Sequence, residues 1–199
     1  MCRVKNPLGF TLFVTFPLGI YSMSLSKLVQ QIRTDRNLTT QVPDFDPNNG
    51  NESAKYLFLL EAPGPRAVVS GKISFDNQDP TAANFREQLS EAGVARADIV
   101  IWNIVPWYIG NPDSAVIRAA GQQDINEGIT YLKQLLSCLP QLKCIVLVGG
   151  AAKRAHLHLS STTTARLVCC HHPSARVMNV NPNASQENIE IFRLIQTTT

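Results

Sequence analysis

The chain has 199 residues, which is enough to bury one hydrophobic core and short for two domains of ordinary size. Apolar residues make up 44% and charged residues 17% of the chain, a balance that is typical of globular proteins and excludes a wholly disordered one. The formal net charge of +3 is compatible with a polyanionic partner, but it is too small to indicate one by itself.

The N-terminal residues follow the order of a secretory signal peptide, because Arg3 and Lys5 precede an uncharged, partly apolar stretch over residues 6–26. Prolines and glycines interrupt this stretch, no A-x-A-like cleavage site follows it, and an amphipathic segment begins at Met23. We therefore expect residues 1–22 to be an N-terminal extension or a start-site artefact, and residues 23–199 to form a single domain. An export signal is the alternative.

The cysteines and histidines do not form a metal-binding or disulfide pattern. The chain has five cysteines, an odd number with no C-x-x-C spacing, which predicts reduced thiols in a cytoplasmic protein. His156 and His158 stand two residues apart without a cysteine or carboxylate cluster beside them. We expect them to lie on a helix surface, with metal ligation as the alternative.

Short apolar runs alternate with segments of helical periodicity along the rest of the chain. Strands are predicted over residues 56–61, 98–103, 144–148 and 165–170. Helices are predicted over residues 24–35, from Thr81 as a cap to Gly93, over residues 122–138, from Gly149 to about His158, and from Ser185 as a cap to the C-terminus. This alternation predicts an α/β fold in three layers, with a central four-stranded parallel sheet and helices on both faces.

A ligand site is expected beyond the carboxyl ends of these strands, as in other open parallel sheets. Four segments reach that edge: residues 61–64, 103–108, 149–150 and 171–174. Polar side chains that follow a buried strand need partners, so their convergence indicates a functional site. The alternative is that each strand simply ends in ordinary turn residues.

Four features at these strand ends resemble the uracil-DNA glycosylase superfamily. They are the motif LEAPG at residues 60–64, Phe75 thirteen residues after Ala62, Asn103 at a strand end, and the motif HPS at residues 172–174. The first motif is similar to the G-E-A-P-G form that one branch of the superfamily carries. The resemblance covers about residues 55–197 and implies a monofunctional enzyme that hydrolyses the N-glycosidic bond of uracil, or of a related deaminated base, in single- or double-stranded DNA. It further implies base excision repair by a cytoplasmic monomer that has no membrane association and no cofactor.

The resemblance also assigns roles to side chains. Phe75 would stack on the extruded base, Asn103 would select uracil through its amide, and His172 would stabilise the negative charge on the departing base. The alternatives are that Phe75 is a core residue and that Asn103 caps its strand. Glu61 would position or deprotonate water, or would instead anchor its loop by accepting backbone N–H bonds. Other expected contacts to the substrate come from Ala62, Pro63, Gly64, Pro173, Ser174 and Arg176. For Arg176, insertion into the duplex, a phosphate contact and plain solvation all stay open.

The sequence departs from the family pattern in three places. Ala62 stands where the best-known members carry an aspartate, although the G-E-A-P-G branch also has alanine there. Gly64 replaces the tyrosine that excludes thymine, so no local residue blocks a 5-methyl group. The missing C-x-x-C pair predicts that the iron–sulfur cluster of that branch is absent. Two further alternatives are a non-catalytic nucleic-acid-binding module on the same fold and a hydrolase of a small nucleoside or nucleotide.

Overall fold

The computed structural model describes residues 2–5, 11–14, 23–111 and 117–197. Its centre is a parallel sheet of four strands in the order β6-β4-β7-β8, which confirms the predicted architecture. The strands are β4 (Tyr56–Leu60), β6 (Ile99–Asn103), β7 (Cys144–Val148) and β8 (Arg166–Cys170). The sheet has this form because its strands are short apolar runs that can be buried on both faces.

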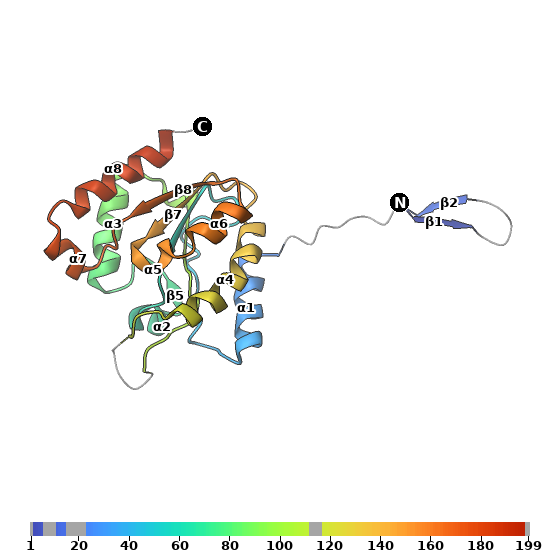
Figure 1. Ribbon diagram of the computed structural model, residues 1–199, viewed down its shortest axis with the longest axis horizontal. Coiled ribbons are helices and arrows are strands. Elements are labelled where there is room, and N and C mark those ends of the chain that lie inside the picture. The colour runs from blue at the N-terminus through green and yellow to red at the C-terminus, as the bar shows by residue number, and fades with distance from the viewer. Residues whose placement is uncertain (1, 6–10, 15–22, 112–116, 198–199) are drawn as a thin grey trace.

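Helices cover the two faces of the sheet (Figure 1). They are α1 (Leu25–Arg36), α2 (Pro65–Ser70), α3 (Pro80–Ala92), α4 (Gln122–Ser137), α5 (Gly149–Lys153), α6 (His156–Thr162), α7 (Ala175–Val180) and α8 (Ala184–Thr197). Helices α3 and α8 pack together on one face, and α1 and α4 pack together on the other. The three layers match the sequence-based prediction.

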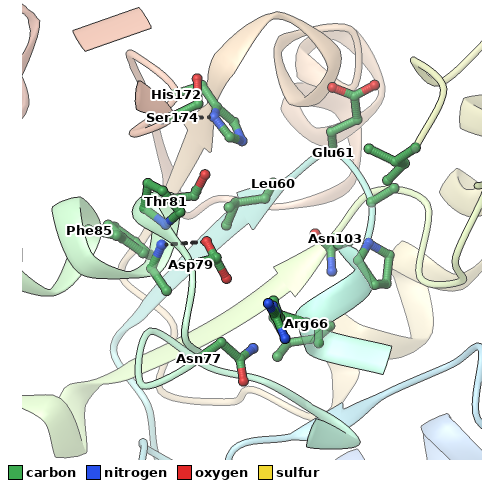
Figure 2. A pocket seen from close by; sticks show the side chains of 18 of the residues that line it. Leu60, Glu61, Arg66, Asn77, Asp79, Thr81, Phe85, Asn103, His172 and Ser174 are labelled. Carbon is green, nitrogen blue, oxygen red and sulfur yellow. Dashed lines mark hydrogen bonds between the residues drawn. The ribbon is translucent and has the colours of Figure 1, made fainter. Parts of the chain in front are cut away.

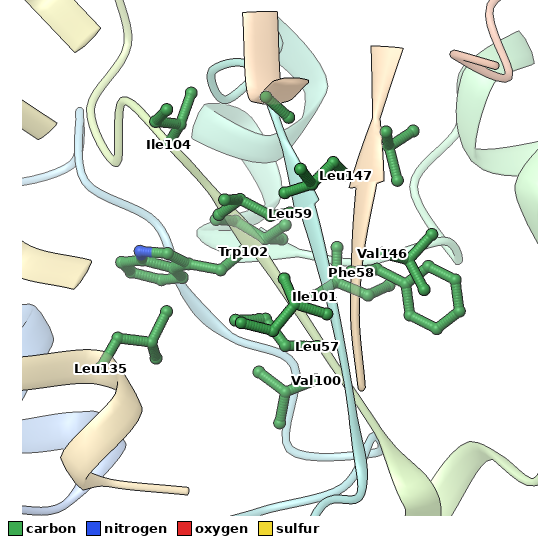
Figure 3. Close-up of a cluster of buried hydrophobic side chains, with 14 of the residues drawn as sticks. Leu57, Phe58, Leu59, Val100, Ile101, Trp102, Ile104, Leu135, Val146 and Leu147 are labelled. Carbon is green, nitrogen blue, oxygen red and sulfur yellow. The ribbon is translucent and has the colours of Figure 1, made fainter. Parts of the chain in front are cut away.

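Aromatic residues fill the core on both sides of the sheet. Phe58 of β4 meets the rings of Phe85 from α3 and Phe192 from α8, each with centroids 5.2 Å apart. On the other face, Trp102 of β6 stacks on Phe45 at 4.0 Å. Figure 3 shows Trp102 and Phe58 on opposite sides of the strands. The alternation of side chains along each strand therefore binds both helical layers to the sheet.

Several local predictions need correction. Helix α3 is capped by Asp79 instead of Thr81, because Pro80 occupies the first helical position, where its missing N–H costs nothing. Helix α8 begins at Ala184, so Ser185 lies inside it. The predicted helix from Gly149 to about His158 is two helices, α5 and α6.

The segment between β4 and α3, for which no helix or strand is predicted, contains α2 and the short strand β5 (Lys72–Ile73). Strand β5 pairs in parallel with β3 (Asp44–Phe45). Helix α7, directly after the HPS motif, was not expected either. These short elements place the residues that surround the carboxyl edge of the sheet.

Strands β1 (Cys2–Lys5) and β2 (Thr11–Val14) form an antiparallel pair near the N-terminus. The prediction that residues 1–22 are an extension or a start-site artefact falls largely outside the described residues. Within the described part of the chain, every helix is too short or too polar to cross a membrane.

Candidate active site

The ends of the four strands bring the predicted residues to one edge of the sheet. Asn103 closes β6, Glu61 follows β4, Gly149 follows β7, and His172 lies two residues beyond β8. The segments after β4 and β6 are bonded to each other, because the N–H groups of Ile104 and Val105 donate to the carbonyls of Leu60 and Glu61. The sheet topology therefore fixes the order of these groups along the edge.

A cavity of about 940 Å³ opens at this edge, within the range of roughly 300–1,000 Å³ that is usual for small-molecule sites. Of the ten residues predicted to act in the site, only Pro173 is not part of its wall. The wall includes Glu61, Ala62, Pro63, Gly64, Phe75, Asn103, His172, Ser174 and Arg176 from the predicted set, and Arg66, Asn77, Asp79, Phe85 and Arg118 besides. Figure 2 shows how several of these side chains face a common space.

Asn103 provides a buried polar group without a protein partner. The residue is only 3% exposed, and its Nδ2 makes no hydrogen bond to the described residues. A buried donor that lacks a partner is rare in folded proteins and costs about 1–3 kcal/mol. Asn103 also lines the cavity, so its amide is available to a bound ligand.

His172 is held as a neutral imidazole. Burial lowers the pKa of its side chain below the usual 6.5, and the nearby carboxylates of Glu61 and Asp79 only partly oppose that shift. The backbone N–H of Ser174 donates to Nδ1 at 3.2 Å, so Nδ1 acts as an acceptor and the proton of the neutral ring belongs on Nε2. The ring can therefore donate a hydrogen bond from Nε2 without carrying a charge.

Two side chains pin the backbone around His172. Asn84 of α3 donates through Nδ2 to the carbonyl of Pro173 at 2.9 Å. Asn188 of α8, which is fully buried, bonds both the N–H and the carbonyl of His171. His171 itself turns outward to Glu187, with 2.6 Å between Nε2 and the carboxylate oxygen. Pro173 thus binds α3 through its carbonyl and does not line the cavity.

Phe75 lies in the cavity wall and is backed by a charged network. The Arg96 guanidinium lies 4.3 Å from the centre of its ring, and Arg96 also binds the carboxylates of Asp46 and Asp76. Asp46 is buried and in turn accepts a hydrogen bond from Ser74, the neighbour of Phe75. The ring edge meets Phe85. Phe75 is therefore both part of the core and part of the cavity wall.

The Glu61 side chain anchors a distant segment of the chain. Its Oε1 accepts the backbone N–H of Ala120 at 2.6 Å. This bond supports the anchoring role that the sequence offered as one of two alternatives. Its partner lies in the segment that leads into α4, and residues Ile117, Arg118 and Ala119 of that segment line the cavity.

Three arginines lie around the cavity, and sequence reasoning singled out only one of them. Arg66 and Arg176 are exposed and have no ion-pair partner among the described residues. Arg118 is paired with Asp124 at 2.6 Å. No local motif distinguishes Arg66 or Arg118 from other surface arginines, so only the fold reveals their position.

Two residues of the predicted strand-end segments, Trp107 and Gly149, do not line the cavity. Trp107 is buried beneath the guanidinium of Arg36 and packs against Tyr131, so it belongs to the core. Gly149 is buried behind His172. Within residues 23–111 and 117–197, no three histidine, cysteine or acidic side chains gather where a metal ion could bind.

A family model for the uracil DNA glycosylase superfamily matches residues 47–195, which contain the four strands of the central sheet and the strand ends that border the cavity. The chain belongs to the uracil DNA glycosylase superfamily. The match covers the LEAPG and HPS motifs together with Phe75 and Asn103. Members of this superfamily are built to act on bases in DNA, which agrees with a cavity bordered by arginines.

Solved structures of the uracil DNA glycosylase kind share the fold. A candidate uracil DNA glycosylase from Methanosarcina acetivorans, solved by NMR, is 17% identical with a TM-score of 0.53, and the similarity covers 76% of this chain and 97% of that one. Wild-type SMUG2 from Pedobacter heparinus, a crystal structure, is 15% identical with a TM-score of 0.55, covering 86% and 96%. A search among curated proteins gives no match. At such identities the likeness concerns the fold alone.

Proposed function

We propose that this protein is a monofunctional DNA glycosylase that hydrolyses the N-glycosidic bond of uracil, or of a related deaminated base, in DNA. The products are the free base and an abasic site. Extruding the nucleotide from the duplex costs a few kcal/mol, so the pocket must recover that free energy through contacts with the base.

The observation that carries this proposal is the unpartnered amide of Asn103 in the cavity wall. Uracil offers a carbonyl at position 4 and an N–H at position 3, which match the Nδ2 donor and the Oδ1 acceptor of one amide. Cytosine has an amino group at position 4, which would place a second donor against the Nδ2 donor of Asn103. The buried Nδ2 of Asn103 has no partner among the described residues, and the carbonyl at position 4 of uracil would provide one.

Two further side chains support base excision. Phe75 lies in the same wall and offers an aromatic ring, and base stacking on such a ring is worth about 1–3 kcal/mol. His172, neutral with its proton on Nε2, would donate to O2 of the base as negative charge develops there. A single preorganised donor of this kind contributes about 3–4 kcal/mol in the transition state.

The exposed arginines favour DNA over a free nucleoside as the substrate. Arg66 and Arg176 lie in the wall of the cavity and are available to phosphates on either side of the extruded nucleotide. A nucleoside hydrolase has no need of such charges. Binding to DNA is expected to weaken as salt rises, because each phosphate contact releases counterions.

One assay tests the proposal. Uracil-containing oligonucleotides, single- and double-stranded, are incubated with the protein and then treated with alkali, which breaks the strand at abasic sites. We expect scission at uracil that is lost in His172→Ala and is lost or redirected to another base in Asn103→Asp. Unchanged uracil selectivity in Asn103→Asp would remove Asn103 from the pocket.

The alternative of a non-catalytic module has one observation in its favour, the methyl group of Ala62 where the best-known members carry a carboxylate. DNA binding without scission would support that alternative. Turnover of free deoxyuridine, without scission of either oligonucleotide, would support the nucleoside hydrolase instead.

A further inference from the structure

The cavity contains a second carboxylate, Asp79, that lies outside both sequence motifs. We propose that Asp79 orients the attacking water and accepts its proton. The inference rests on the proposed glycosylase function, because the attack of water on the sugar is the step that needs a base.

The reaction requires a proton acceptor, and Ala62 of the LEAPG motif cannot supply one. The oxygen of water forms a bond to C1′ of the deoxyribose while the bond from C1′ to N1 of the base breaks. The electron pair of the broken bond leaves with the base, and one water proton must be removed. Ala62 has no group that can take it, so the acceptor must come from elsewhere in the wall. Among the residues that the structure describes, the carboxylates of that wall are those of Glu61 and Asp79.

The fold fixes the carboxylate of Asp79 within the cavity. Its Oδ1 accepts the N–H of Ala82 at 2.9 Å as the cap of α3, which holds the side chain in one orientation. Its Oδ2 has no hydrogen bond to the described residues and is available to water. A residue that only caps a helix needs one oxygen, so the second oxygen of Asp79 is open for another task.

The position of Asp79 suits a group that acts at the sugar. It lies four residues after Phe75, which would hold the base, and its charge is close enough to His172 to influence that ring. Figure 2 shows the Asp79 carboxylate in the middle of the view, among the side chains of His172, Asn103 and Arg66. A carboxylate there would also stabilise the positive charge that develops on the sugar.

Glu61 is less suited to this role, although it is adjacent to Ala62. Its Oε1 accepts the N–H of Ala120 at 2.6 Å, which holds the side chain against the segment before α4. Figure 2 shows the Glu61 carboxylate pointing away from Asp79 and Asn103. We therefore assign Glu61 to holding the segment before α4, and the proton transfer to Asp79.

The complete step is balanced without a cofactor. Water gives its oxygen to C1′ and a proton to Asp79 Oδ2, and the base leaves as an anion that Nε2–H of His172 stabilises. The proton on Asp79 then passes to solvent, and the base anion takes a proton from solvent. The products are the free base and the abasic sugar with a hydroxyl at C1′.

The test compares two substitutions that preserve shape and hydrogen bonding. Asp79→Asn keeps a good helix cap, since asparagine and aspartate cap equally well, but it removes the base. Glu61→Gln tests the competing carboxylate of the wall, and its amide oxygen can still accept the Ala120 N–H. We expect Asp79→Asn to lower single-turnover uracil excision by about 10²–10⁴-fold at an unchanged melting temperature, and Glu61→Gln to change it far less.

A binding measurement separates a chemical role from a structural one. An oligonucleotide with a pyrrolidine in place of the target sugar carries a positive charge near C1′, whereas a tetrahydrofuran analogue of the same shape is neutral. Asp79→Asn should lose roughly tenfold or more in affinity for the charged analogue, with little change for the neutral one. Equal affinities of the wild type and the variant for the charged analogue would overturn the proposal.

The outcomes distinguish this inference from the proposed function. If Glu61→Gln abolishes excision and Asp79→Asn does not, the glycosylase stands and the assignment to Asp79 is wrong. If the wild-type protein excises no base and binds neither analogue, the proposed function itself fails.

Discussion

Gly149 lies directly against the imidazole of His172: a Cβ atom at position 149 would be 3.0 Å from the Cβ and 3.3 Å from the Cδ2 of His172. The backbone of Gly149 has a φ of 79°, which side chains of L-amino acids rarely adopt. The residue that follows β7 is therefore glycine for two physical reasons, and one of them is its contact with the His172 ring, which we propose stabilises the leaving base.

Replacing Gly149 with alanine should lower both the stability of the protein and its rate of excision. The left-handed backbone would cost about 1–2 kcal/mol of folding free energy. The new methyl group would displace the His172 ring, and a misplacement of about 1 Å can reduce the rate by about 100-fold. Thermal unfolding and single-turnover excision measure the two effects.

Gly150→Ala is the matched control for this prediction. Gly150 is the next residue of the same helix, is exposed, and has open space where a Cβ would stand. It should retain the stability and the excision rate of the wild type. If Gly149→Ala excised uracil as fast as Gly150→Ala and were equally stable, the methyl group would not displace the His172 ring, and the prediction would be wrong.

Phe75→Leu should weaken the binding of a base without weakening the binding of DNA as such. Removing the aromatic face should cost about 1–3 kcal/mol with DNA that carries an extruded uracil. DNA with a tetrahydrofuran site has no base to stack, so its affinity should not change. Fluorescence anisotropy with both oligonucleotides, using a uracil nucleotide that resists hydrolysis, measures the difference. An equal loss with both would mean that Phe75 only supports the wall.

The sheet and the strand ends could be predicted from local sequence because they depend on short-range signals. An apolar run such as residues 144–148 has few ways to be buried, and the residue that follows a parallel strand must lie at the carboxyl edge. This reasoning located Asn103 and His172 correctly without any long-range information.

Contacts between distant segments could not be predicted in this way. The approach of Ala120 to Glu61 and of Arg96 to Phe75 depends on how separate loops fold over the sheet. The preference for Asp79 over Thr81 as a helix cap is a local signal that was available, because Pro80 marks the first helical position. Choosing the correct cap would have drawn attention to Asp79.

Gly64→Tyr should narrow the range of accepted bases. A Cβ at position 64 would meet nothing within 4 Å, so the cavity is open where the family places the tyrosine that excludes thymine. We expect the wild type to accept bases with substituents at position 5, and the variant to excise uracil while rejecting 5-hydroxymethyluracil. The measurement is the ratio of the excision rates of uracil and 5-hydroxymethyluracil from otherwise identical duplexes. A ratio that does not change would place C5 of the base away from Gly64.

The burial of His172 predicts how stability and activity depend on pH. Because burial lowers the pKa of His172 in the folded state below 6.5, the unfolded chain binds a proton first as the pH falls. The contribution of the neutral ring to the free energy of unfolding is therefore full above about pH 6.5. It decreases as the pH falls toward the folded-state pKa, by at most about 1.4 kcal/mol per pH unit. Denaturant unfolding between pH 7.5 and pH 5 should show a shallower loss of stability in His172→Asn than in the wild type.

Excision should stay constant from about pH 6.5 to 8, since the neutral ring donates from Nε2 throughout. A rate that falls steadily above pH 6.5 would require a charged imidazolium and would contradict the tautomer that the Ser174 hydrogen bond fixes.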